Sequence, residues 1–292
     1  MKPLWLRQKP PDREALQKMR GLLQRYSLNT VCEGALCPNR GECFNRGTVT
    51  FLILGRTCTR SCTFCAIPSE EQPPAPDPDE PERLAAAAAD LGLKHVVVTS
   101  VTRDDLEDGG ASHFAQTVRV LKKTVSTIVV EVLIPDFQGS FESLKIVVDS
   151  GPDIVNHNLE TVPRLYPEVR PQAEYTRSLR LLSLVKEINP EKTTKSGLML
   201  GLGEERKEIL TVMDDLRKVG CDLLTLGQYL QPSGRHRPVT RYVPPEEFDD
   251  LRKEGEGMGF KAAFSAPFVR SSFHAAEIFA KGVKGTSENR SL

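Results

Sequence analysis

Residues 32–65 read CEGALCPNRGECFNRGTVTFLILGRTCTRSCTFC and contain six of the seven cysteines of this 292-residue chain. These six form two triplets of different spacing, C-x4-C-x5-C (Cys32, Cys37 and Cys43) and C-x3-C-x2-C (Cys58, Cys62 and Cys65). Three thiolates suit a cubane iron–sulfur cluster, which offers four irons and can leave one of them for another ligand. Two triplets therefore suggest two clusters.

Disulfides, structural zinc and core packing are the three competing roles for these cysteines. Disulfide frameworks are typical of short secreted chains, whereas this chain is long and its first residues contain no apolar signal-peptide region. Structural zinc usually takes two C-x2-C pairs, and only Cys62 and Cys65 have that spacing. Core cysteines would have apolar neighbours, but Thr, Arg and Ser separate the cysteines of the second triplet. The pattern favours iron–sulfur clusters.

A short apolar run lies between the two triplets. Residues 48–54 (TVTFLIL) predict the first buried strand, so the second triplet falls on the loop just after it. In a barrel of parallel strands the active-site groups lie on the loops that follow the strands. The first triplet lies in residues 32–48, where Pro38, Gly41 and Gly47 predict a loop around a cluster.

The rest of the chain alternates between helical and strand patterns. An N-terminal helix is expected after Asp12, and the prolines between residues 68 and 81 indicate an extended connector. The expected helices are residues 81–91, 112–124, 140–149, 174–188, 204–219 and 245–258, and the expected strands are 48–54, 95–99, 127–134, 153–157, 196–201 and 223–226, with a last short run at 261–264. This alternation predicts an α/β fold with a parallel sheet covered by helices.

Composition excludes several classes of function. Lys plus Arg equals Asp plus Glu at 39 each, so a broad nucleic-acid surface is not expected. No apolar run approaches a membrane span, and a reducing, cytoplasmic location is expected for exposed clusters. Cys221, outside the two triplets, is interpreted as a core residue near a strand start.

The second triplet resembles the C-x3-C-x-aromatic-C signature of the radical S-adenosylmethionine (SAM) superfamily, with Phe64 in the aromatic place. The resemblance implies a partial (β/α)6 TIM-type barrel and a [4Fe–4S] cluster whose fourth iron binds SAM. The first triplet, directly before such a motif, resembles the lipoyl synthase family. That resemblance implies a second, auxiliary [4Fe–4S] cluster held by Cys32, Cys37 and Cys43.

Two later stretches carry the same resemblance. K195-SGLMLGLGE is similar to the superfamily's glycine-rich element along the adenosine of SAM, which implies contacts from Lys195, Gly201, Gly203 and Glu204. R270-SSFHA resembles the lipoyl synthase motif R-S-S-Y-x-A, which implies that Ser272 ligates the auxiliary cluster. Sequence physics alone favours a helix-capping serine there. A hydroxyl oxygen is a hard ligand for iron, so Ser272 is expected to be the labile ligand and to take part in catalysis.

Other polar residues follow the strands. Residues 103–110 are typical of a capped turn, and residues 156–161 (NHNLET) place several polar side chains at a strand end. A lone histidine such as His157 is better interpreted as a hydrogen-bonded core residue. Four basic residues past a later strand are candidates for contacting an acidic carrier protein, with a solvated loop as the alternative: Arg235, His236, Arg237 and Arg241.

The resemblance implies a sulfurtransferase that inserts sulfur at C6 and C8 of a protein-bound octanoyl group, with the auxiliary cluster as sulfur donor. The implied partners are octanoylated lipoyl domains of 2-oxoacid dehydrogenase E2 subunits, the glycine cleavage H protein, and a reductant such as ferredoxin or flavodoxin. Alternatives are another sulfur-inserting radical SAM enzyme, such as a methylthiotransferase or biotin synthase, and a non-enzymatic iron–sulfur protein. Three segments are expected: an auxiliary-cluster extension (1–47), the barrel (48–265), and a serine-motif segment (266–292) whose end, from 281, is a disordered tail.

Overall fold

The computed structural model describes residues 2–8 and 12–288. The chain divides into two compact units. We call Gln8–Ser61 with Cys65–Val155 the N-terminal unit, and Met1–Arg7, Cys62–Phe64 and Asn156–Leu292 the C-terminal unit.

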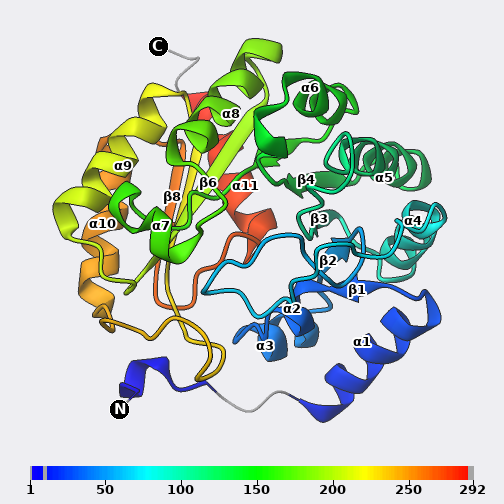
Figure 1. The fold of residues 1–292 in the computed structure, drawn as a ribbon, viewed down its shortest axis with the longest axis horizontal. Coiled ribbons are helices and arrows are strands. Elements are labelled where there is room, and N and C mark those ends of the chain that lie inside the picture. Colours follow the sequence, from blue (N-terminus) through cyan, green and yellow to red (C-terminus); the bar gives the residue numbers. More distant parts are fainter. Residues whose placement is uncertain (1, 9–11, 289–292) are drawn as a thin grey trace. The chain divides into compact units, whose positions relative to one another are not determined.

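Strands and helices alternate along the N-terminal unit. Its elements are α1 (Arg13–Arg25), β1 (Asn29–Thr30), α2 (Val31–Gly34), α3 (Arg40–Asn45), β2 (Thr50–Ile53), α4 (Glu80–Asp90), β3 (His95–Ser100), α5 (Ala111–Thr124), β4 (Val129–Leu133), a 3-10 turn η2 (Phe137–Gly139), α6 (Phe141–Asp149) and β5 (Ile154–Asn156). Strands β2, β3 and β4 pair in parallel. Helices α4, α5 and α6 lie in a row outside these strands (Figure 1).

The C-terminal unit continues the alternation. Its elements are η1 (Leu4–Leu6), η3 (Pro163–Leu165), α7 (Tyr166–Val169), α8 (Tyr175–Ile188), β6 (Thr193–Leu200), α9 (Arg206–Lys218), β7 (Leu223–Gln228), α10 (Pro245–Gly257), β8 (Ala262–Ser265) and α11 (Ala275–Glu288). Strand β6 pairs in parallel with β7, and β7 with β8. Helices α9 and α10 lie along one side of these strands (Figure 1).

Burial accounts for the strands that these runs form. Val96, Val98, Val130 and Val132 are fully buried in β3 and β4, because parallel strands covered by helices are apolar on both faces. The capping residue predicted for the first helix is confirmed, since the Asp12 carboxylate accepts a hydrogen bond of 2.8 Å from the Glu14 amide. The α/β class and the order of helices and strands are therefore as the sequence predicts.

Four expectations need correction. Residues 32–48 are not a continuous loop, because they contain most of α2 and all of α3. The two-residue strand β1, antiparallel to β2, and the helix α7 were not expected, and β6 begins at Thr193 rather than at residue 196. Residues 281–288 continue α11 instead of forming a tail, whereas 289–292 lie outside the described residues. Within the described part of the chain no helix is long and apolar enough to cross a membrane.

Candidate functional site

The loop after β2 carries Cys58, whose sulfur is an acceptor for two backbone amides. The amides of Arg60 and Thr102 donate to Cys58 Sγ over 3.4 Å and 3.3 Å. Backbone N–H groups directed at sulfur are a regular feature of iron–sulfur sites, where they tune the cluster. The position of Cys58 therefore suits a metal-bound sulfur.

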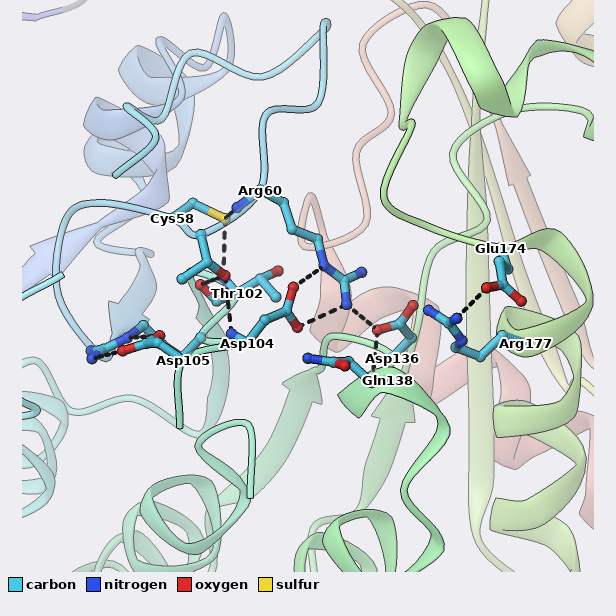
Figure 2. A network of polar contacts seen from close by, with 11 residues as sticks. Cys58, Arg60, Thr102, Asp104, Asp105, Asp136, Gln138, Glu174 and Arg177 are labelled. Carbon is cyan, nitrogen blue, oxygen red and sulfur yellow. Dashed lines mark hydrogen bonds and ion pairs between the residues drawn. The ribbon is translucent and has the colours of Figure 1, made fainter. Parts of the chain in front are cut away.

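An ion-pair network lies beside Cys58 (Figure 2). The Arg60 guanidinium makes two hydrogen bonds, of 2.6 Å and 2.9 Å, to Asp104, and a third, of 2.6 Å, to Asp136. The Arg60 side chain is 5% exposed and that of Asp136 is fully buried. Burial alone would lower the pKa of Arg60, but the hydrogen bonds to Asp104 and Asp136 raise it. Arg60 is thus a permanently charged, fixed group two residues after Cys58.

The next cysteine of the loop, Cys62, belongs to the C-terminal unit. Its neighbour Thr63 fixes the backbone there: the Thr63 amide donates to the carbonyl of Val169 over 3.0 Å, and its hydroxyl donates to the carbonyl of Glu168 over 3.0 Å. The amide of Arg237 in turn donates to the Thr63 carbonyl over 2.9 Å. Phe64, like Cys62 and Cys65, is half-buried. The helix α7, which the sequence reasoning missed, therefore supports this loop.

The first triplet lies in the N-terminal unit, on and between α2 and α3. Thr30 caps α2 by accepting a hydrogen bond of 3.1 Å from the Cys32 amide, and the Cys37 amide donates to the Cys32 carbonyl over 3.1 Å. The pKa of the Cys43 thiol is raised to about 12, mainly by burial and in smaller part by electrostatic interactions with Cys32 and Cys37.

The donor set of both triplets fits iron–sulfur clusters. None of these six cysteines forms a disulfide, and thiolate is the ligand that iron–sulfur clusters use. No three His, Cys, Asp or Glu side chains within residues 2–8 and 12–288 form a site for a single metal ion. The cysteines of a cluster bind different irons, so the assignment rests on the ligand type and the spacing.

A cluster of polar side chains lies in the C-terminal unit, shortly after the end of β5. The Asn158 amide nitrogen donates to Glu160 over 3.0 Å, whereas the buried oxygen Asn158 Oδ1 has no hydrogen-bond partner among the described residues. Burial raises the pKa of Glu160, and the positive charge of Arg170 partly offsets this increase. A buried acceptor without a partner is costly, so a polar ligand is expected at Asn158. The sequence indicated polar residues at this strand end, but their pairing required the tertiary structure.

His157 belongs to the same stretch but has a packing role. It is 2% exposed, and its Nε2 lies 3.0 Å from the Ser178 hydroxyl. The interpretation of His157 as a hydrogen-bonded core residue is confirmed. So is the core position of Cys221, which is fully buried and whose pKa is raised by that burial to about 12.

The glycine-rich turn after β6 is held by the carboxylate of Glu204. The amides of Gly201 and Leu202 donate to this carboxylate over 2.6 Å and 2.9 Å. Gly201 has φ of +102°, and a Cβ there would lie 2.3 Å from the carbonyl oxygen of Arg241. Gly203 also has a positive φ, of +114°. Gly201, Gly203 and Glu204 therefore shape the turn.

Lys195 and the serine motif meet in the C-terminal unit. Lys195 is fully buried, and its Nζ donates to the backbone carbonyl of Ser271 over 2.6 Å. The Asn158 amide nitrogen also donates to the Ser271 hydroxyl, over 2.5 Å. Ser272 is half-buried and precedes α11, which begins at Ala275. Lys195 thus fixes the backbone, and Asn158 the side chain, of the residue directly before Ser272.

Local ion pairs hold the turn after β3 and the basic loop. In the turn, Arg103 pairs with Asp105 over 2.7 Å, and Asp108 accepts from the amides of Gly110 and Ser112, as a capped turn requires. In the basic loop Arg237 pairs with Glu168 over 2.8 Å and Arg241 with Glu247 over 2.7 Å. Arg235 is exposed.

The chain is similar to known proteins over most of its length. The family model for the radical SAM superfamily matches residues 52–216. The lipoyl synthase of Alkaliphilus metalliredigens is 55% identical over 280 residues, covering 96% of each chain. That of Trichlorobacter lovleyi is 56% identical over 275 residues, covering 94% of this chain and 97% of its own.

Solved structures share the fold at low identity. SuiB of Streptococcus suis bound to S-adenosylmethionine superposes with a TM-score of 0.55 at 18% identity, covering 83% of this chain and 56% of that one. The hydrogenase maturase HydG superposes with a TM-score of 0.57 at 18% identity, covering 72% and 48%. The fold class, a partial (β/α) barrel, is confirmed.

Proposed function

Because the chain belongs to the lipoyl synthase family of radical SAM enzymes, we propose that it inserts two sulfur atoms, at C6 and C8, into a protein-bound octanoyl group. The observation that carries the proposal is the pair of cysteine triplets in a chain 55% identical to a lipoyl synthase over 96% of its length. The family membership implies a [4Fe–4S] cluster and SAM.

The second triplet is assigned to the SAM cluster. Cys58, Cys62 and Cys65 would supply its three thiolates, with Phe64 beside them. The two amides directed at Cys58 Sγ support its assignment as a cluster ligand, because hydrogen bonds to the sulfurs are a regular feature of iron–sulfur sites. When bound, this cluster and SAM supply the electron and the radical that abstracts hydrogen, and the auxiliary cluster supplies sulfur.

SAM is assigned to the strand ends of the C-terminal unit. The Asn158 oxygen and the half-buried Glu160 carboxylate offer acceptors for hydroxyl or amine donors of such a ligand. The turn of Gly201, Gly203 and Glu204 is proposed to lie along the adenosine of SAM, and the Glu204 carboxylate fixes its backbone. Lys195, which the sequence suggested as a contact of SAM, is proposed instead to hold the serine motif, residues 270–275, beside this site.

The auxiliary cluster is assigned to Cys32, Cys37 and Cys43, with Ser272 as the fourth ligand. The spacing of these three cysteines, on and between α2 and α3, supports the assignment of the triplet. The fixed backbone at Ser271 supports that of Ser272, because a hydroxyl ligand must be held in place to compete with thiolates. The N-terminal extension, residues 1–47, would then carry the three cysteine ligands of this cluster. The C-terminal segment, residues 266–292, would add the fourth ligand, Ser272.

Substrate and reductant follow from the proposed reaction. The octanoyl group would arrive on a lysine of a lipoyl carrier domain, such as an E2 subunit or the H protein, through a small transient contact. The exposed Arg235 is the side chain of the basic loop best placed to meet an acidic carrier, because Arg237 and Arg241 have partners within the chain. A low-potential donor such as ferredoxin or flavodoxin would supply electrons.

Iron and sulfide counts on anaerobically reconstituted protein test the two-cluster assignment. Wild type is expected to hold two clusters. Replacing Cys58, Cys62 and Cys65 with Ala should leave about half of the iron, and so should replacing Cys32, Cys37 and Cys43, since a cluster needs its thiolates. Replacing Cys221 with Ala is the matched control and should change neither count. Complete loss of iron from either triple variant, or no loss, contradicts two independent sites.

A further inference from the structure

The cluster-binding loop at Cys58 is clamped to the turn after β3. The Thr59 amide donates to the Thr102 carbonyl over 3.0 Å, and the Asp104 amide donates to the Thr59 hydroxyl over 3.0 Å. The Thr102 amide is one of the two donors to Cys58 Sγ. The position of this donor relative to the sulfur therefore depends on how the two loops are held together.

The side chains of Arg60, Asp104 and Asp136 tie the same two loops and a third one. Arg60 follows Cys58, Asp104 follows Thr102, and Asp136 follows β4, where its carboxylate also accepts from the Gln138 amide over 3.1 Å (Figure 2). The guanidinium bridges both carboxylates. Arginine suits this task, because its planar fork binds a carboxylate through two parallel hydrogen bonds and stays charged when buried.

We infer that the Arg60–Asp104–Asp136 network is a positioning device that holds two N–H donors on Cys58 Sγ and thereby sets the reduction potential of the cluster bound there. Hydrogen bonds to the sulfurs are one determinant of iron–sulfur potentials. Reduction adds negative charge to the cluster, and N–H dipoles directed at sulfur stabilise that charge. Loosening the network is therefore expected to make the potential more negative. The inference rests on the proposed assignment of Cys58 to the SAM cluster.

The test is a redox titration of the holoenzyme followed by the electron paramagnetic resonance signal that changes on adding SAM. Asp104→Asn and Asp136→Asn should both shift the midpoint of this signal to a more negative potential. Asp105→Asn is the matched control: its carboxylate lies in the same turn but pairs with Arg103 rather than with Arg60, so the midpoint should not move.

These outcomes distinguish a network that positions the donors to Cys58 from one that only stabilises the fold. If Asp136→Asn fails to fold because it leaves the buried Arg60 short of a partner, Asp104→Asn, whose side chain is 26% exposed, still gives the answer. A folded Asp104→Asn variant that loads no SAM-responsive cluster, beside a normally loaded control, also supports positioning of Cys58. Normal loading with an unchanged midpoint would overturn the inference. A wild type without any SAM-responsive signal would instead overturn the assignment of the cluster.

Discussion

The buried ammonium group of Lys195 donates a hydrogen bond of 2.6 Å to the backbone carbonyl of Ser271, directly before the proposed ligand Ser272. The sequence suggested Lys195 only as a contact of SAM. In the structure a charged donor from β6 fixes the C-terminal serine motif, so this lysine connects the strand ends to the segment that would complete the auxiliary cluster.

We expect Lys195→Met to lower the iron content while SAM binding is retained. Methionine preserves the length and packing of the side chain but removes a charge-assisted hydrogen bond that contributes about 2 kcal/mol. Iron counts and equilibrium dialysis with SAM measure the two effects. Lys253→Met, on the exposed face of α10, is the control. Full iron content together with weakened SAM binding would instead assign Lys195 to SAM.

Ser272→Ala should still cleave SAM, because the ligands of the SAM cluster are unchanged, but it should fail to complete lipoyl product. Ser272→Cys should hold the auxiliary cluster more tightly and donate sulfur more poorly, since thiolate matches iron better than oxygen. Both are measured by quantifying 5′-deoxyadenosine and lipoyl product in one reaction. Ser271→Ala removes a neighbouring hydroxyl that bonds Asn158 and is the matched comparison. A normal lipoyl yield from Ser272→Ala would end the ligand hypothesis.

Charge reversal at Arg235 should raise the apparent KM for an octanoylated carrier about fivefold, which corresponds to about 1 kcal/mol, and should weaken its salt dependence. The variant Arg235→Glu tests this without breaking an internal ion pair, unlike a change at Arg237, which pairs with Glu168. Arg119→Glu, an exposed change on α5, controls for net charge. Identical kinetics for the two variants would remove this loop from the interface.

Asp222 gives the C-terminal unit a pH-dependent stability. Burial alone would raise the pKa of Asp222, but hydrogen bonds from Lys186, the Thr194 amide and Lys261 lower it. A carboxylate with a lowered folded-state pKa stabilises above its unfolded pKa of about 3.9, and the contribution is lost as the pH falls below that value.

Asp222→Asn should therefore lower the free energy of unfolding by about 2 kcal/mol at pH 7, and by progressively less below pH ~4. Denaturant midpoints of the two proteins at several pH values measure this difference. A gap that stays constant down to acid pH would mean that packing, and not the ion pairs, accounts for the loss.

The sequence predicts the order of strands and helices because the apolar runs are regular and because caps such as Asp12 are local. It misses α7, whose four residues include a proline and depend on the burial of Tyr166 and Val169 against the rest of the unit. The pairing of Asp104 with Asp136 through Arg60 was also not predictable, since these residues come from three separate loops. The cysteine spacing indicates iron–sulfur chemistry, but the groups that position the cysteines are brought together only by tertiary contacts.

Sulfur insertion is tested most directly by the mass of an octanoylated carrier domain incubated anaerobically with the reconstituted protein, SAM and a reductant. We predict a gain of two sulfur atoms with the loss of two hydrogens on the acyl chain, and two 5′-deoxyadenosine molecules for each lipoyl group formed. An unmodified octanoyl carrier, in a reaction that does consume SAM, would contradict the proposed function.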